Sequence, residues 1–281
     1  MKERLARGWL ARYRRQPGAT AGLILALAVV FTAVFAPWIA PYPPKLTAGP
    51  ALQPPSAAHL FGTDDLGRDL FSNVVHGARV ALLVGLTTAL TSAVIGTLVG
   101  LLSGYLGGRW DDLLMRLTET FQLLPRFFLA LLLVSLLGSD IIWIALLLGL
   151  TFWPGTARVL RAQVLSVRGR EHVLAARAVG VHERTIMLRH VLPLAFAPVI
   201  ISAARMVAGA ILTEASLSFL GLGDPTLVSW GQLLSNAQRF LRTAWWLFLF
   251  PGAALALTVL ATTLVADGLV GALQPSSARR G

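Results

Sequence analysis

Four ionisable residues lie within or beside long apolar stretches of this chain of 281 residues: Glu119, Arg126, Arg205 and Glu214. A charge inside a membrane is costly, so each of them is a candidate for function. Because they carry both signs, they are suited to line a polar path and to meet the charged groups of a zwitterion. The simpler interpretation, which we favour, is that they pair between helices or snorkel to the membrane interface.

Sequence spacing predicts a common helix face for only one of the two pairs, Glu119 and Arg126. Glu119 precedes Arg126 by seven residues, about two helical turns, so a continuous helix would place both on one face. Pro125, directly before Arg126, is expected to kink that helix and free a carbonyl group. Arg205 and Glu214 are nine residues apart, a spacing that does not place them on one helical face.

Residues that could bind a metal form no convincing set. Asp64, Asp65 and Asp69 are close in sequence, but a hard cation needs several convergent oxygens. We expect Asp64 and Asp65 to cap a helix, and Asp69 to lie beside Arg68 in solvent. The histidines lack the spacing of metal ligands and are scattered over the chain: His59, His76, His172, His182 and His190.

The sequence shows no catalytic machinery. Its only lysines are Lys2 and Lys45, and neither has the Gly-Lys-Ser/Thr context of a phosphate-binding loop. There is no cysteine, which excludes a thiolate nucleophile or thiolate metal site. No Ser–His pair or HExxH motif lies in the apolar stretches. We therefore expect a chain that is not an enzyme and binds no cofactor itself.

The most informative polar segment runs from Arg158 to Pro193, between two apolar stretches. A basic segment in this position is expected in water on the cytoplasmic side of a membrane. Its centre, from Glu171 to Val179, is rich in alanine and is closed by Gly180, which predicts a short helix with a glycine stop. Small side chains suit a helix that another protein approaches closely.

This segment resembles the EAA cytoplasmic loop of ABC-importer permeases. The matching positions are Ala175, Ala176, Gly180, Leu192 and Pro193. Two positions depart from the motif, because Leu174 stands in place of its glutamate and His190 in place of a hydrophobic residue. The resemblance implies that the short helix docks on a partner ATPase. The residues expected to couple to the ATPase are Glu171, Leu174, Ala175, Ala176, Arg177, Gly180, Leu192 and Pro193.

Further blocks, in matching order, resemble the second permease subunit of dipeptide, oligopeptide and nickel ABC importers. They occupy residues 59–72 (HLFGTDDLGRDLFS), 77–85, 211–223, 229–234 and 250–275. The resemblance implies the type I importer fold, a second permease, an extracytoplasmic solute-binding protein, and two ATP-binding subunits that hold ATP and Mg²⁺. It also implies a di- or oligopeptide as substrate, with a nickel chelate or another small solute as the alternative.

Composition indicates an integral membrane protein before any motif is considered. The chain is 56% hydrophobic and 13% charged, whereas soluble domains carry about 25% charged residues. The net charge of +11 is concentrated at the two termini and in the polar segment, which follows the positive-inside rule and argues against nucleic-acid binding. We expect a multi-pass protein in contact with the lipid of a bacterial or archaeal inner membrane, with both termini in the cytoplasm.

Apolar stretches of about 20 residues predict an all-α protein with six spans: 21–39, 80–103, 117–137, 141–157, 193–212 and 243–266. The first lacks a clean cleavage site, so it is read as a span and not as a signal peptide. The predicted organisation is a basic cytoplasmic N-terminus (1–20), a first transmembrane helix (21–40), an outer loop (41–79), a five-helix core (80–272) that contains the coupling loop 158–193, and a cytoplasmic tail (273–281).

Two local expectations complete this description. In the outer loop, Thr63 or Asp64 is expected to cap an interfacial helix. In the second span, the small residues Gly96, Gly100 and Gly104 predict close helix packing, within the chain or against the partner permease. A self-contained secondary transporter is the rival class, but it predicts repeated halves with broken helices, and no repeat is visible.

Overall fold

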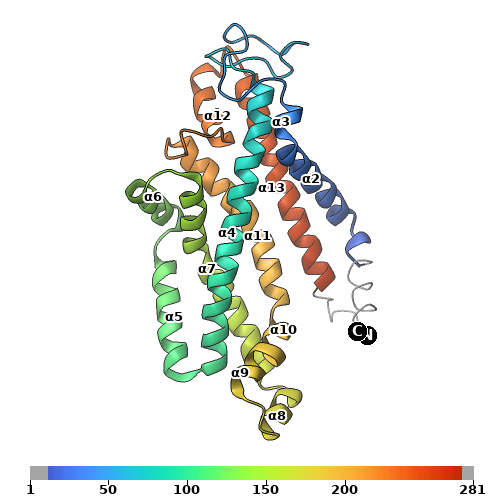
Figure 1. The fold of residues 1–281 in the computed structure, drawn as a ribbon, viewed down its shortest axis with the longest axis vertical. Coiled ribbons are helices and arrows are strands. Elements are labelled where there is room, and N and C mark those ends of the chain that lie inside the picture. The colour runs from blue at the N-terminus through green and yellow to red at the C-terminus, as the bar shows by residue number, and fades with distance from the viewer. Residues whose placement is uncertain (1–11, 274–281) are drawn as a thin grey trace.

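The structure, a computed structural model, describes residues 12–273. It is a bundle of long helices that run along one axis (Figure 1). In the described part of the chain, the helices long and apolar enough to cross a membrane are α2 (Pro17–Val34), α4 (Leu70–Leu106), α7 (Ile141–Arg168), α11 (Ala197–Phe219) and α13 (Trp246–Leu273). A bent pair, α5 (Gly108–Leu123) and α6 (Arg126–Leu137), is the sixth span if the two helices cross together. The predicted all-α membrane fold is confirmed.

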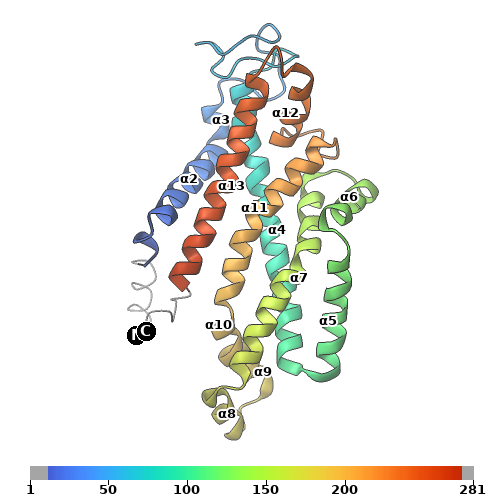
Figure 2. The same cartoon turned by 180° about the vertical axis from the view of Figure 1, so that it is seen from behind.

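Shorter elements lie at the two ends of the bundle. One end carries α8 (Glu171–Ala178), α9 (Glu183–Thr185), a π-helix (Ile186–Val191) and α10 (Leu192–Ala195). The opposite end carries α3 (Ala36–Ile39), a loop of residues 40–69, α12 (Trp230–Ala237) and a 3₁₀ turn (Gln238–Phe240). We call them the α8 end and the α12 end (Figures 1 and 2). The basic N-terminus up to residue 11 and the tail from residue 274, including Arg279 and Arg280, lie outside the described residues.

The predicted interfacial helix capped by Thr63 or Asp64 is wrong. The carboxylate of Asp64 closes a turn by accepting from the amides of Leu66 and Arg68, at 2.9 and 2.8 Å. The helix begins at Leu70, where the side chain of Asp69 accepts from the amide of Ser72 at 2.8 Å. From there α4 continues through 37 residues, so the expected boundary at residue 80 between loop and span does not exist.

The predicted third span, 117–137, is also wrong as a continuous helix. The axes of α5 and α6 differ by 85° across the break at Leu124 and Pro125. Proline lacks an amide proton and disfavours helical geometry in the residue before it, and Leu124 accordingly has the extended angles φ −81° and ψ 129°. The result is a bend close to a right angle, which is much sharper than the kink expected from sequence.

Helix α7 extends further than its apolar composition indicates. It ends at Arg168, so the polar loop expected from residue 158 starts only at Gly169. The reason is a continued apolar face: Leu160, Val164 and Val167 are buried, each at most 1% exposed. Smaller shifts occur at the first span, which begins at Pro17 and not at residue 21, and at the fifth, which is divided into α10 and α11.

The glycine series in α4 packs within the chain, against α7. A Cβ added at Gly100 would lie 2.4 Å from the carbonyl oxygen of Ala157. At Gly96 it would lie 2.6 Å from Cβ of Thr156, and at Gly104 2.9 Å from Cβ of Val164. Because real Cβ atoms do not approach other atoms so closely, the three glycines allow the two longest central helices to touch along their backbones.

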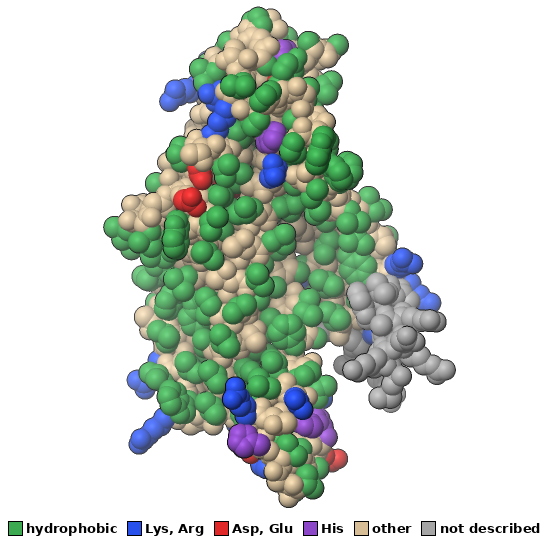
Figure 3. All heavy atoms as spheres, in the orientation of Figure 1, with side chains coloured by type: hydrophobic (Ala, Val, Ile, Leu, Met, Phe, Trp, Pro, Cys, Tyr) green, Lys and Arg blue, Asp and Glu red, His purple; other side chains and the backbone are tan. Residues whose placement is uncertain are grey.

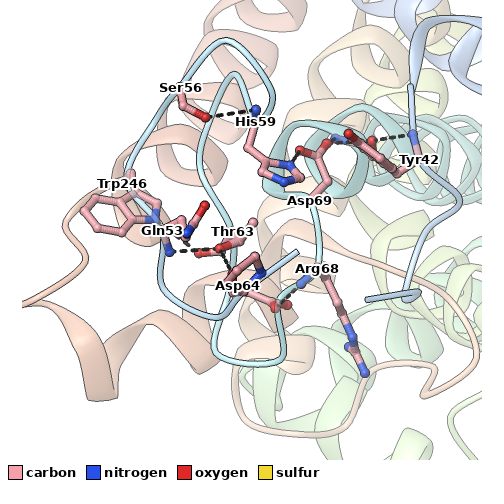
Figure 4. A network of polar contacts seen from close by, with 11 residues as sticks. Tyr42, Gln53, Ser56, His59, Thr63, Asp64, Arg68, Asp69 and Trp246 are labelled. Carbon is pink, nitrogen blue, oxygen red and sulfur yellow. Dashed lines mark hydrogen bonds and ion pairs between the residues drawn. The ribbon is translucent and has the colours of Figure 1, made fainter. Parts of the chain in front are cut away.

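The loop 40–69 is an ordered cover over the α12 end, held by hydrogen bonds to its own backbone and to the bundle (Figure 4). The hydroxyl of Thr63 donates to the Pro50 carbonyl at 2.7 Å and accepts from the Gln53 amide at 2.9 Å. Trp246, at the start of α13, donates from Nε1 to the Thr63 carbonyl at 3.2 Å. The loop therefore has a fixed position on the helices.

Candidate functional site

The segment between α7 and α11 forms the α8 end and projects past the long helices (Figures 1 and 2). The predicted helix is present as α8, Glu171–Ala178, directly after the turn at Gly169. Glu171 lies in its first turn and Arg177 in its last, which places each charge at the helix end whose dipole favours it.

The inner face of α8 is anchored by one residue. Val173 is fully buried and packs in a cluster with Val167 of α7 and with Ile186 and Val191 of the π-helix. All these side chains are at most 1% exposed. The helix is thus fixed by apolar contacts to the end of a spanning helix, so a displacement of α8 is transmitted to α7 and the reverse.

The outer face of α8 remains uncovered. Leu174 is 49% exposed and Val179, just after the helix, is 79% exposed. Glu171, Ala175 and Arg177 are exposed as well. The exposed side of α8 therefore presents one large apolar side chain, Leu174, among small and charged residues.

Gly180 ends the helix in the conformation for which glycine is suited. Its φ is +80°, and nothing lies within 4 Å of the position of a Cβ. The amide of Gly180 donates to the Arg177 carbonyl and the amide of Val181 to the Ala176 carbonyl, both at 3.1 Å. This is a Schellman C-cap. Glycine is needed at this position for backbone angle and not for space.

Arg177 and Glu183 form an ion pair across this turn, and Tyr105 at the end of α4 joins it. Nε and Nη2 of Arg177 lie 2.7 and 3.1 Å from the two carboxylate oxygens of Glu183. The hydroxyl of Tyr105 donates to the same carboxylate and lies 3.2 Å from the Glu183 carbonyl oxygen. The guanidinium of Arg177, aided by the Tyr105 hydroxyl, holds the pKa of Glu183 below its usual range. We call these three residues the Arg177–Glu183–Tyr105 clasp.

Two more arginines, Arg168 and Arg161 of α7, contact α4 and α5 near this segment. Nη1 of Arg168 donates to the Gly104 carbonyl at 2.8 Å, so it caps the end of α4. Arg161 of α7 makes a two-point contact with Asp111 of α5, with both distances 2.6 Å, and Ser103 of α4 donates to Asp111 too. Helices α4, α5 and α7 are therefore joined by polar contacts near the α8 end.

The eight residues predicted to couple to an ATPase are divided by the structure into two groups. Glu171, Leu174, Ala175, Arg177 and Gly180 lie exposed on or beside α8. The other three differ: Ala176 and Leu192 are half-buried against the cluster around Val173, and Pro193 lies in α10. Ala176 and Leu192 thus support the segment from within, whereas Pro193 is exposed.

Sequence reasoning missed Val173, Glu183 and Tyr105. A signal existed for Val173, the β-branched residue among the small and charged residues of α8. None existed for the clasp: Tyr105 is 78 residues from Glu183, and the separation of six positions between Arg177 and Glu183 fits no helical spacing.

The candidate path residues Glu119 and Arg126 do not share a helix face, because the bend separates α5 from α6. Glu119 is exposed and lines a pocket of about 400 Å³ with Asp112, Met115 and Arg116 of α5 and with Arg158 and Arg161 of α7. Arg126 lies over the ring of Phe152, 5.4 Å from its centroid, a cation–π contact. Only Glu119 is therefore placed in a charged pocket.

The other two candidates make contacts within the bundle. Arg205 of α11 pairs with Asp267 of α13 at 3.4 Å, and both side chains are about 60% exposed. Glu214 is only 2% exposed and accepts from the Ser218 hydroxyl at 2.6 Å, one turn along α11. The Arg205–Asp267 pair is the pairing between helices that the simpler interpretation expects, whereas Glu214 is buried and bonded within its own helix.

The acidic residues Asp64 and Asp69, near the α12 end, accept hydrogen bonds from backbone amides. Asp69 is 2% exposed and lies 2.9 Å from Nδ1 of His59, so its expected solvent position beside Arg68 is wrong (Figure 4). Its burial follows from its two tasks, because it caps α4 and holds His59. In the described residues no group of three His, Asp or Glu side chains could hold a metal ion.

Comparison with known families gives two matches that together cover most of the chain. Residues 96–279 match the family described as binding-protein-dependent transport system inner membrane component. Residues 5–55 match the N-terminal TM domain of oligopeptide transport permease C. The first match contains the whole α8 end, and the second contains α2.

Curated relatives are similar over nearly their full lengths. The dipeptide transport system permease protein DppC of Escherichia coli K12 is 45% identical over 271 residues, which is 94% of this chain and 90% of that protein. The di/tripeptide transport system permease protein DppC of Pseudomonas aeruginosa is 40% identical, with 94% and 89% covered. The oligopeptide transport system permease protein OppC of Bacillus subtilis is 35% identical, with 95% and 88% covered.

Proposed function

Because this chain belongs to the family of binding-protein-dependent transport system inner membrane components, we propose that it imports short peptides as one of two permease subunits driven by partner ATPases. The partners would be a second homologous permease, two ATP-binding subunits that hold ATP and Mg²⁺, and an extracytoplasmic solute-binding protein. The chain itself supplies the path and the joint to the ATPases, and it performs no chemistry.

One observation carries this proposal, namely the two-sided character of α8. Its inner side is tied to α7 through the fully buried Val173, and its outer side presents Leu174 at 49% exposure. A rigid helix that is fixed on one side and open on the other can transmit the movement of a docked partner to the bundle. Such transmission requires that the ATPases bind here.

Transport then follows from alternating arrangements of two permeases. Closure of the ATPases on ATP would move α8, and α8 would move α7 with α4, because the two are packed backbone to backbone at Gly100. The charged pocket around Glu119 is lined by α5 and α7. A zwitterionic peptide in this pocket would meet charged groups of both signs.

The proposed orientation places the α8 end in the cytoplasm. Both termini would lie on that side, and the ordered loop 40–69 with α12 would face the solute-binding protein. The fixed geometry of this loop, including the bond from Trp246 to the Thr63 carbonyl, supports a docking platform, since little ordering entropy is lost on binding.

A pull-down from native membranes tests the coupling joint. Tagged full-length chain in mild detergent is expected to bring down a second permease and ATPases with phosphate-binding loops. The variant Ala175→Glu, on the exposed face of α8, is expected to lose ATPase recovery by about tenfold or more, the loss typical of an interface hot spot. The matched control is Ser166→Glu, exposed on α7. Equal recovery with both variants would refute the joint at α8.

Uptake in proteoliposomes that contain the whole complex tests the substrate. ATP-dependent uptake of a labelled dipeptide is expected to be inhibited by other short peptides and not by a nickel chelate. If the nickel chelate is transported and the dipeptide is not, the peptide proposal is wrong while the ATPase joint stands.

A further inference from the structure

A basic pocket at the α12 end has no task in the coupling joint or in the charged pocket around Glu119. Its volume is about 360 Å³, within the range of roughly 300–1,000 Å³ of ligand sites. Three basic side chains line it: Lys45 from the loop, and His76 and Arg79 on one face of α4. The remaining lining is Pro44, Val80, Leu83, Thr226, Leu227 and Val228, so no carboxylate is among the lining residues.

Two of the three basic groups of this pocket have no partner in the described part of the protein. Among the described residues, neither the imidazole of His76 nor the guanidinium of Arg79 has a hydrogen-bond or ion-pair partner. The carboxylate of Asp224 attracts the Lys45 ammonium and also accepts from the amide and hydroxyl of Thr226 and from the amide of Ile141. Because Asp224 offsets at most the charge of Lys45, the guanidinium of Arg79 leaves the site with a positive charge that is suited to an anionic ligand.

Lys45 is held in place by an unusual backbone. Its φ of +65° is rare for a residue with a side chain. The conformation is fixed from both sides, because its amide lies 3.4 Å from Oδ1 of Asn73 and its ammonium donates to the Pro225 carbonyl. Such strain persists only where surrounding contacts determine it, and it recurs at ligand sites. The ammonium retains two further donors for a ligand.

The position of the pocket along α4 corresponds to the headgroup level of a membrane. Arg79 is the last charged residue before an uncharged run from Val80 through Ser103, about 36 Å of helix. That length matches a hydrocarbon core of roughly 30 Å. In Figure 3 a histidine and a basic side chain lie together over the upper part of α4, above a broad band of hydrophobic side chains.

An exposed apolar strip continues from the pocket into this band. Leu83, which lines the pocket, is 40% exposed, and Leu86 and Leu90 follow at 58% and 68%. They succeed Arg79 at helical spacing, so the strip lies on the same face. From Arg79 to Leu90 the helix rises about 16 Å, roughly half of the hydrocarbon core. A ligand that fills both parts has an anionic head and an apolar chain about one leaflet long.

We propose that this pocket, formed by Lys45, His76 and Arg79, binds the phosphate of an anionic phospholipid whose acyl chain lies along Leu83, Leu86 and Leu90. A short peptide would satisfy the cations but leave the strip uncovered, which favours the lipid. The bound lipid would connect loop 40–69 to α4 and thereby stabilise the α12 end. This inference does not depend on which solute is transported.

The test uses purified full-length chain in nanodiscs of phosphatidylcholine with or without dioleoyl phosphatidylglycerol. Thermal unfolding and native mass spectrometry report stabilisation and retained lipid. Phosphatidylglycerol is expected to raise the unfolding temperature and to be retained. Arg79→Gln should weaken retention about fivefold, since a basic residue near a membrane surface is worth about 1 kcal/mol toward an anionic lipid. Arg79→Lys should keep most of it.

The matched control is Arg242→Gln, which removes an exposed arginine at the same end and should leave retention unchanged. Retention equal in wild type, Arg79→Gln and a Lys45→Gln/His76→Gln double variant would overturn the proposal. So would equal stabilisation by inorganic phosphate alone, which would assign the pocket to a free anion. Displacement of the lipid by a dipeptide would assign the pocket to the substrate carboxylate and would equally overturn it.

Discussion

At the scale of single residues, Arg177 makes a contact within the chain besides the contact with an ATPase that we expect of it. A guanidinium at the end of an exposed helix is expected to reach a partner, but here it is engaged by the carboxylate of Glu183 at two points. Two-point contacts of this kind fix orientation as well as distance. The Arg177–Glu183–Tyr105 clasp therefore orients α8 relative to α4, while the Arg177 side chain stays 47% exposed.

Breaking the clasp should uncouple ATP use from transport. Glu183→Gln and Tyr105→Phe remove the charge and the hydroxyl at the joint, so α8 would lose its direct tie to α4 and keep only the indirect connection through Val173 and α7. We expect the ratio of peptide taken up to ATP hydrolysed to fall about three- to tenfold in proteoliposomes, while the complex still assembles. Glu171→Gln, an exposed carboxylate on the same helix, is the control. An unchanged ratio in both clasp variants would contradict the coupling role.

The clasp should also resist acid. Because Arg177 holds the pKa of Glu183 below its usual range, its contribution is present above the ordinary carboxylate pKa of about 4.3 and is lost only as the pH falls through the lower folded value. Hydrogen exchange of residues 171–185, corrected for intrinsic rates, should show unchanged protection from pH 7 down to about 4.5 in wild type. Glu183→Gln should lower protection at every pH. Loss of wild-type protection near pH 6 would show that another group governs the loop.

At the scale of elements, the packing of α4 on α7 decides how far a movement at α8 travels. Three glycines remove side chains from the contact, and the approach at Gly100 is to backbone atoms of Ala157, which cannot move aside. Rigid contact between backbones transmits displacement with little loss. The joint at α8 and the α12 end are thus connected by two helices that behave as one unit.

A side chain at Gly100 should break this unit. Gly100→Val would force the helices apart and should lower the free energy of unfolding by about 1–3 kcal/mol, the usual cost of overpacking. Unfolding in detergent, followed by circular dichroism, measures it. Gly155→Ala is the control, because nothing lies within 4 Å of a Cβ there, and it should be neutral or slightly stabilising. Equal effects of the two substitutions would show that α4 and α7 separate easily.

At the scale of the whole molecule, the bundle has two polar pockets with different surroundings. The pocket around Glu119 is mixed in charge, with Asp112 and Arg158 among its lining residues. In the pocket around Arg79 the ionisable lining residues are all basic, and the rest of the lining is mostly apolar. Because they lie at different levels of the bundle and differ in charge, a zwitterionic solute and an anionic lipid are separated by location as well as by chemistry.

Substitution in the first pocket should affect uptake without affecting the fold. Glu119→Gln removes one of its negative charges and should raise the KM for a dipeptide several-fold, with the unfolding temperature unchanged. Arg205→Gln, which breaks an exposed pair with Asp267 worth at most about 1 kcal/mol, should leave uptake kinetics unchanged. If Glu119→Gln transports normally at all dipeptide concentrations, the residue belongs to the structural group and not to the path.

Much of this architecture could be predicted from sequence because its causes are local. Hydropathy over about 20 residues identifies the spans, and a glycine after an alanine-rich run predicts the stop of α8, which Gly180 makes with φ +80°. The absence of a phosphate-binding loop in the sequence and the order of the family blocks indicated a permease that does not itself bind ATP, and the family match confirmed the permease.

Only the tertiary structure decided the rest, because its causes are contacts between distant residues. Whether Asp64 or Asp69 starts α4 depended on His59 and on loop packing, and not on the cap preference that both share. The 85° bend replaced an expected kink, which separated Glu119 from Arg126. The contact of Tyr105 with Glu183 joins residues 78 positions apart, and the assembly of Lys45 with Arg79 requires the loop 40–69 to fold back onto α4. Sequence spacing predicts only which residues share a face of one helix, whereas these sites form where several segments of the chain pack together.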